Sequence, residues 1–346
     1  MRDNITGKSI LLIGDPFYGY CNYIKDQLQL IGAKSVYYVE MPLYFGSFRD
    51  SINLTTLVYW LKDPKIRIHW TERLENELAD KSFDTFFVIE KMPFHKSFFD
   101  YLKAKNPNIR TILFLWDTFR TQQSRYLDYL PLFDKVYTFD RDDATKYHLS
   151  YFPDFYIENK AVPVEKCKYD LAFVGTMAPN DTGFRGNVLS AISKFCKAEG
   201  FEYFFYLRYY GLESKNRLKK WYNMIRYWGY YRNIERLKKN GFFYNNPLSL
   251  YEYNNIMANT KAIIDLSHRN RQGMTINAIT ALASEKKLIT TNSRIKEEPF
   301  YDSQMVYIIN EKNPIFDPNF LRSPHKKIDM TYLRMDNWLK HVVNEL

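Results

Sequence analysis

One segment joins an apolar run, a polar basic loop and a second apolar stretch, which is typical of an anion-binding turn. Residues 262–280 read AIIDLSHRNRQGMTINAIT. The pattern predicts a strand, a loop in which Gly273 allows close backbone approach, and a helix near Thr275. A helix start presents unpaired N–H groups and about half a positive charge, so it favours phosphate. We therefore predict a diphosphate-binding loop; an ordinary strand–helix connection with solvated basic residues is the alternative.

Two aspartates follow apolar runs in the first half of the chain and are candidate general bases. Asp117 follows Trp116 at the end of the run 111–116, and Asp15 follows the run 9–13. Burial raises the pKa of a carboxyl group towards the working range of a base. Both positions are also common turn positions, so a structural role is the alternative. A retaining mechanism needs no protein base.

The tripeptide Asp140-Arg141-Asp142 resembles a D-x-D metal site, in which two carboxylates share a divalent cation with a diphosphate. Such a tripeptide is common by chance. The histidines other than His268 have no partners at metal-ligand spacing. We predict neither a metal nor a cofactor.

Residues 208–239 form the most basic part of the sequence, with tryptophans and tyrosines among the lysines and arginines. Basic side chains attract anionic headgroups, and tryptophan and tyrosine favour the membrane interface. The segment is therefore expected to contact a membrane or a lipid-linked acceptor, a solvated helical insertion being the alternative. Nucleic acid also suits this composition, but we expect no nucleic-acid partner. The candidate contact residues are Trp221, Arg226, Trp228 and Arg232.

Strand-like and helix-like segments alternate along the chain. The elements they form must position the candidate binding and catalytic residues named above. The first unit reads as a strand at 9–13, a helix ending before Gly32 and a strand at 35–39. Thr71 is expected to start a later helix. The alternation restarts after Pro163, with strands at 169–174 and 287–291 and a helix at 275–285. Such units build parallel sheets, in which ligands bind beyond the carboxyl ends of the strands.

Composition narrows the class of protein. The 346 residues are 46% hydrophobic and 18% aromatic, and 49 Lys and Arg against 39 Asp and Glu favour phosphate-bearing partners. Three scattered cysteines exclude a disulfide framework and fit a reducing compartment. The apolar run near the N-terminus is too short for a signal peptide, and no run approaches a membrane span. There is no G-x-G-x-x-G, P-loop, H-E-x-x-H or G-x-S-x-G motif. We expect a cytoplasmic protein.

Several stretches within residues 111–292 carry a family resemblance: TILFLWDT at 111–118, FDKVYTFD at 133–140, YFPDFY at 151–156, YDLAFVG at 169–175, the loop and helix at 262–280, and KLITTN at 287–292. In this order they resemble bacterial GT-B glycosyltransferases of the CgeB-like group, which also covers capsule and lipopolysaccharide synthesis. The likeness extends over roughly residues 110–300. In that group the donor helix reads G-x-T-x-R-x-x-E. Here Asn277 stands at the Arg position and Thr280 at the Glu position.

The resemblance implies an α/β fold of the GT-B type: two Rossmann-like domains that face a central cleft, with a C-terminal helix that crosses back to the first domain. The expected domains are an acceptor domain at 1–160, a nucleotide-sugar donor domain at 161–325 with the insertion 208–239, and a C-terminal helix at 326–346. Donor-binding roles are expected for Gly175, Thr176, His268, Gly273, Met274, Thr275 and Thr280. Arg185 is added from its position, because it starts the helix that follows the Gly175 loop.

The expected activity is transfer of a sugar from a nucleotide-sugar donor to a cell-surface glycan of a capsule, lipopolysaccharide or exopolysaccharide. The expected partners are the donor, a glycan or lipid-linked glycan acceptor, and an anionic membrane surface contacted peripherally on its inner face. Because Asn277 and Thr280 depart from the group's pattern, the alternative is a catalytically impaired binding or scaffold protein of a polysaccharide assembly complex.

Overall fold

The computed structural model of the chain describes residues 5–16, 19–41, 54–119, 124–158, 162–177, 183–209, 217–267 and 273–344. It divides into two compact units. The first comprises Met1–Phe155, Asn270–Gly273 and Tyr332–Leu346, and the second comprises Tyr156–Arg269 and Met274–Thr331. Within the described ranges each unit holds a six-stranded, all-parallel sheet. The prediction of two Rossmann-like domains is confirmed.

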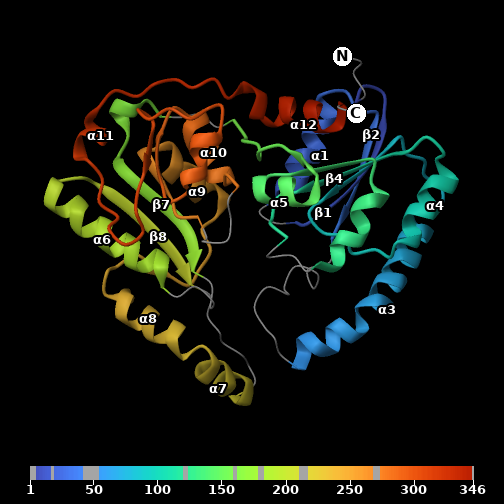
Figure 1. Cartoon of the computed structure of the whole chain (residues 1–346), viewed down its shortest axis with the longest axis horizontal. Helices are drawn as coiled ribbons and strands as arrows, with labels where there is room; N and C mark the ends of the chain where they lie inside the picture. The colour runs from blue at the N-terminus through green and yellow to red at the C-terminus, as the bar shows by residue number, and fades with distance from the viewer. Residues whose placement is uncertain are drawn as a thin grey trace. The chain divides into compact units, whose positions relative to one another are not determined.

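The first sheet has the strand order β2-β1-β3-β4-β5-β6, and helices connect its strands (Figure 1). In chain order this unit contains β1 (Ser9–Gly14), α1 (Tyr20–Leu30), β2 (Ser35–Glu40), α3 (Leu54–Glu77), β3 (Thr85–Ile89), α4 (Ser97–Lys105), β4 (Arg110–Leu115), the 3₁₀ segment η3 (Ser124–Leu132), β5 (Lys135–Thr138), α5 (Arg141–Tyr147), β6 (Ser150–Tyr151) and α12 (Met335–Asn344). All five residues of β3 are buried, as expected for a central parallel strand covered on both faces.

Helix α3 begins at Leu54, well before Thr71, so the prediction that Thr71 starts this helix is wrong. The Thr71 hydroxyl is buried and accepts the N–H of His95 at 2.8 Å. A threonine ahead of an apolar stripe is typical of a helix start, but here its hydroxyl makes a tertiary contact from inside the helix.

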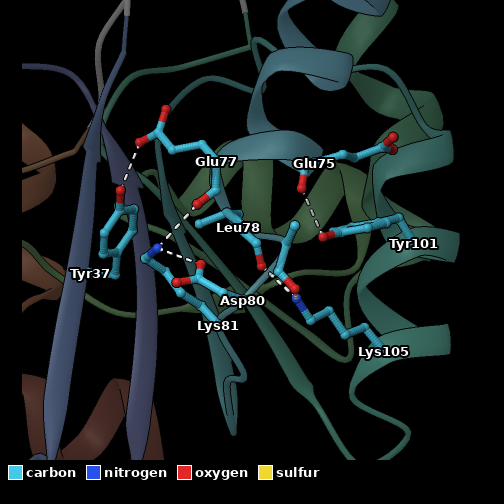
Figure 2. Close-up of polar contacts among 9 residues, drawn as sticks. Tyr37, Glu75, Glu77, Leu78, Asp80, Lys81, Tyr101 and Lys105 are labelled. Carbon is cyan, nitrogen blue, oxygen red and sulfur yellow. Dashed lines mark hydrogen bonds and ion pairs between the residues drawn. The ribbon is translucent and has the colours of Figure 1, made fainter.

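Basic side chains hold the C-terminal end of α3 (Figure 2). Lys81 donates to the carbonyl of Glu77 at 3.1 Å, and Lys105 donates to the carbonyl of Leu78 at 2.5 Å. The Tyr37 hydroxyl of β2 donates to the Glu77 carboxylate at 2.8 Å. The last carbonyls of a helix have no intrahelical partner and carry partial negative charge, so lysines suit this position. These contacts join α3 to α4 and to the edge of the sheet.

The C-terminal helix α12 packs on the first unit, as the fold prediction expected. The Trp338 indole is fully buried, and its N–H donates to the carbonyl of Pro153 at 2.9 Å. Its ring lies edge-on to Phe114 of β4 and to Phe155, with centroids 4.6 and 5.0 Å apart. Arg110 donates to the carbonyl of Val343. These contacts fix the end of the chain against one face of the first sheet.

The second sheet has the strand order β12-β11-β10-β7-β8-β9. Its unit contains the 3₁₀ segment η4 (Val164–Lys166), β7 (Tyr169–Met177), α6 (Phe184–Glu199), β8 (Tyr203–Tyr209), α7 (Arg217–Arg226), α8 (Trp228–Lys238), β9 (Phe243–Tyr244), α9 (Leu250–Ala258), β10 (Thr260–Asp265), α10 (Ile276–Ala283), β11 (Lys287–Thr290), η5 (Ser293–Glu297), β12 (Val306–Ile308) and α11 (Pro318–Arg322). The short η6 (Thr331–Leu333) begins in this unit, and its last two residues belong to the first unit. Side chains of α6, α8 and α11 share one core with the sheet.

Strand β7 is longer than the predicted strand 169–174, because it continues through Met177. Gly175 and Thr176 therefore lie inside the strand, opposite Leu207 and Arg208 of β8, and not in a loop after it. Gly175 fits there because a Cβ would lie 2.6 Å from the Phe173 ring. Close packing explains this glycine without a ligand.

Candidate functional site

Each sheet has one point at which the strand order reverses, and there the carboxyl ends of two neighbouring strands open towards a ligand. In the first sheet the reversal lies between β1 and β3, and in the second it lies between β7 and β10. Arg185 and Thr275 lie near the reversal of the second sheet, and Asp15 and Asp117 follow strands near the reversal of the first.

Arg185 joins the two strands at the reversal of the second sheet. From the first turn of α6 it donates through Nη1 to the carbonyl of Thr176 at 2.5 Å, at the end of β7. Its Nε and Nη2 donate to the carbonyl of Leu266, just after β10, at 3.1 and 2.9 Å. The guanidinium therefore fixes both strand ends and places a positive charge between them.

A buried carboxylate organises the loop that leaves β10. Asp265 accepts the hydroxyl of Thr275 at 2.9 Å and that of Ser267 at 3.0 Å, and the Thr290 hydroxyl lies at 3.4 Å. Burial raises the pKa of Asp265, while these hydroxyls and the Arg185 charge oppose that shift. Asp265 thus ties together the ends of β10 and β11 and the start of α10. The position of Asp265 within an apolar run does not indicate this structural role.

Thr275 is the N-cap of α10, because its hydroxyl accepts the N–H of Ala278 at 3.1 Å. The same hydroxyl donates to Asp265, so its proton is already engaged. The helix runs from Ile276 to Ala283, slightly shorter than the predicted 275–285. The positive end of the α10 dipole therefore lies at the carboxyl edge of the second sheet.

The other donor-side positions have different surroundings. Met274 is buried, and Thr280 is half-buried on α10. Gly273 groups with the first unit, where a Cβ would lie 2.4 Å from the Phe139 ring and 2.7 Å from its carbonyl oxygen, so packing accounts for this glycine. His268, with Arg269 and Arg271, lies outside the described residues.

Asn277, at the position where the resembled group has arginine, accepts the hydroxyl of Tyr253 at 2.5 Å. This hydrogen bond connects α10 to α9. The side chain at this position thus serves a contact between two helices of the same unit.

In the first unit, charged side chains follow the strands on both sides of the reversal. Asp15 follows β1 and forms an ion pair with Lys91, Oδ2 to Nζ, at 3.7 Å. Glu90 follows β3, is buried, and accepts the N–H of Trp116 at 3.1 Å. Its φ of 75° lies in the left-handed region, which is uncommon for a non-glycine residue and costs free energy. Asp117 follows β4 and is half-buried. Asp15, Glu90 and Asp117 thus follow three neighbouring strands.

Asp154 is a buried carboxyl group that the sequence did not single out. Its Oδ1 has no hydrogen-bond partner among the described residues. Burial raises its pKa well above the usual value, and the charges of Glu90 and Asp117 raise it further. Asp154 is therefore a buried carboxyl group whose charged form is disfavoured, near the carboxylates of Glu90 and Asp117. A polar residue between Pro153 and Phe155 carries no periodic signal that would reveal its burial.

Asp154→Asn should make the protein more stable at alkaline pH. Because the folded state keeps a proton on Asp154 that the unfolded state has lost, stability falls as pH rises above about 4, by at most about 1.4 kcal/mol per pH unit. Asparagine is neutral at every pH, so the variant does not show this pH-dependent loss of stability. Thermal unfolding at pH 5, 6.5 and 8 should show a gain over wild type that grows with pH, while Asp142→Asn, at an exposed position, should show none. A gain independent of pH would contradict the assignment.

The Asp140-x-Asp142 tripeptide caps a helix. The Asp140 carboxylate accepts the N–H groups of Asp142 and Asp143 at the start of α5, at 3.0 and 3.1 Å. Asp143 accepts the N–H of Phe119 at 2.8 Å. In the part of the chain that the structure describes, no three His, Cys, Asp or Glu side chains group as metal ligands would.

The four predicted contact residues of the basic insertion lie on α7 and α8. The side chains of Trp221, Arg226, Trp228 and Arg232 are all exposed. No described helix is both long and apolar enough to cross a bilayer.

Comparisons with known proteins agree with this architecture. No protein-family model matches the sequence, and no curated protein matches it. Among solved structures, similar folds include a Methanocaldococcus jannaschii UDP-GlcNAc 2-epimerase in complex with UDP-GlcNAc and UDP (TM-score 0.54, 10% identity, 97% of this chain and 99% of that chain covered). Others are a Burkholderia vietnamiensis α,α-trehalose-phosphate synthase (UDP-forming) (0.52, 10%, 98% and 95%) and S. aureus MnaA with UDP (0.52, 11%, 96% and 94%).

These likenesses extend over nearly the whole length of both chains. Together with the two parallel sheets they define the class of the fold: it is the two-domain, Rossmann-like GT-B architecture. At such low identity they show the fold and not the reaction.

Proposed function

We propose that this protein is a glycosyltransferase that moves a sugar from a nucleotide-sugar donor to a cell-surface glycan acceptor at the cytoplasmic face of the membrane. The observation that carries the proposal is the edge of the second sheet, where Arg185 and the start of α10 bring positive charge to the strand reversal. Support also comes from solved neighbours of the same fold, which hold UDP or a UDP-sugar. The resemblance to the CgeB-like group supports the glycan acceptor.

The donor is assigned to the second unit. Its diphosphate would accept hydrogen bonds from the first-turn amides of α10, and the Arg185 charge would stabilise the negative charge that develops as the bond to the anomeric carbon breaks. Thr176, Met274, Thr280, Thr275 and His268 remain the proposed surroundings of the donor. Gly175 and Gly273 are left out, because close packing accounts for both glycines and Gly273 groups with the first unit. Thr275 would act through the helix cap, because its hydroxyl proton is engaged by Asp265.

The acceptor is assigned to the first unit, with Asp117 as the proposed general base. When the acceptor oxygen bonds to the anomeric carbon, its proton would pass to the Asp117 carboxylate. Asp15 is the weaker candidate, because its carboxylate is already engaged in an ion pair with Lys91.

The experiment is a thermal-shift panel of nucleoside diphosphates and nucleotide sugars, followed by product analysis with the stabilising donor. A ligand at one hundred times its Kd stabilises the folded state by about 2.7 kcal/mol, so a true donor should raise the unfolding temperature clearly. Transfer or slow hydrolysis of that donor supports the proposal. A donor that is isomerised without release of the diphosphate would assign an epimerase, and the absence of stabilisation by any nucleotide would overturn the proposal.

The alternative function is a donor-binding protein without turnover that recruits a polysaccharide assembly complex. The contact of Asn277 with Tyr253 favours it, because the residue at the usual arginine position is committed to helix packing. Nucleotide-dependent stabilisation without any transfer or hydrolysis would select this alternative.

A further inference from the structure

Helix α7 turns its apolar side chains towards solvent. Leu218, Trp221, Tyr222 and Ile225 recur at the spacing that places residues on one face of a helix. Leu218 is 79% exposed and Trp221 is 65% exposed, and the other two are also exposed. Trp228, at the start of α8, is 63% exposed. We call these five side chains the α7 face.

Helix α8, in contrast to α7, packs apolar side chains against the second unit. Tyr230, Ile234 and Leu237 of α8 are buried, and the Tyr230 hydroxyl donates to the carbonyl of Met177 at the end of β7, at 3.0 Å. Figure 1 shows α7 extending beyond α8, away from β7 and β8. Packing within the unit therefore accounts for Tyr230, Ile234 and Leu237 of α8 but leaves the α7 face, including Trp228, unexplained.

The same hairpin carries strong positive charge. Residues 217–239 include eight Lys or Arg residues and a single acidic residue, Glu235. The side chains of Arg226, Arg232 and Arg236 are exposed. Arg226 also lies close to the α7 face, since it donates to the Tyr222 hydroxyl at 3.0 Å. At Arg226, a cationic group therefore lies directly beside the apolar α7 face.

We propose that the α7 face docks on an anionic phospholipid surface, with its tryptophans at the headgroup level and the neighbouring arginines against lipid phosphates. A short helix with exposed Trp, Leu and Ile on one side and basic residues beside them has the chemistry of an interfacial helix. Clustered lysines and arginines bind anionic headgroups electrostatically, which is the charge complementarity that selects this occupant. Membrane docking through α7 and α8 does not depend on sugar transfer.

The test is co-sedimentation of the whole protein with phosphatidylcholine vesicles, with and without phosphatidylglycerol. We expect binding to the anionic vesicles only, weakened by salt because the electrostatic part is screened. Trp221→Ser combined with Ile225→Ser should weaken vesicle binding by about tenfold or more. The double variant loses two apolar side chains that the membrane would otherwise cover. Tyr251→Ser is the matched control, because Tyr251 of α9 is 80% exposed in the same unit and lies outside the α7 face.

Absence of binding to anionic vesicles, or equal loss in the Tyr251 control, would overturn the inference. Analytical ultracentrifugation checks the competing occupant: a dimer that dissociates in the double variant would assign the face to a second copy of this chain. Vesicle binding is measured without nucleotide, and nucleotide binding is measured without vesicles. A failure of the membrane proposal can therefore be distinguished from a failure of the proposed nucleotide-sugar function.

Discussion

Asp117→Asn should lower the turnover number for sugar transfer by about 10²- to 10⁴-fold, the usual contribution of a positioned general base. Asparagine has nearly the same shape but cannot take up the acceptor proton. Since it keeps the polar contacts available to the side chain, donor binding and the unfolding temperature should change little. The measurement is initial rates at saturating donor, with nucleotide affinity determined by calorimetry on the same preparation.

Two control variants make the Asp117 result specific. Asp142→Asn alters an exposed carboxylate and should leave the rate within about twofold, as for most surface substitutions. It also tests the D-x-D interpretation, because loss of a metal ligand would abolish activity. Asp15→Asn should have a smaller effect than Asp117→Asn. Full activity of the Asp117 variant would remove Asp117 from the mechanism and favour a reaction that needs no protein base.

Arg185→Ala should destabilise the second unit by about 2–5 kcal/mol and weaken UDP binding by about tenfold or more. The guanidinium satisfies the carbonyls of Thr176 and Leu266, and each buried acceptor left without a partner costs about 1–3 kcal/mol. UDP binding weakens because the diphosphate loses the positive charge of Arg185 at the strand reversal. Chemical denaturation and calorimetric titration with UDP measure the two effects.

Arg185→Lys separates the charge from the geometry. Lysine keeps the charge but lacks the planar fork, so we expect UDP affinity to recover more than stability does. Arg322→Ala is the matched control, since it removes a more exposed guanidinium of the same unit that pairs with Glu199, and such a pair contributes about 0–1 kcal/mol. Unchanged UDP affinity in both Arg185 variants would show that this arginine is structural only.

The strands were predictable because the parallel sheets need apolar runs covered on both faces, and these runs end at Gly, Asp or Pro. Strands β1, β4 and β10 follow that rule. The start of α3 was not predictable from Thr71, whose hydroxyl serves a tertiary contact. The end of β7 was also misplaced, because Gly175 suggests a turn while its actual role is to make room for the Phe173 ring.

The candidate site was predictable in outline but not in its supporting contacts. Parallel strands bring Asp15, Asp117 and Arg185 to sheet edges, and that follows from the order of elements. Asp265 and Asp154 were missed because a single carboxyl group within an apolar or irregular stretch carries no pattern that indicates burial. Their importance comes from tertiary packing: Asp265 from three hydroxyls that converge on it, and Asp154 from its position near other carboxylates.

Amide hydrogen exchange with and without UDP tests most directly whether the edge of the second sheet holds a diphosphate. We expect slower exchange in peptides that contain the first turn of α10 and the end of β7, and no such change with uridine, which lacks phosphates. Saturating UDP that leaves these peptides unchanged, or that protects only peptides of the first unit, would contradict the assignment of the donor to this edge.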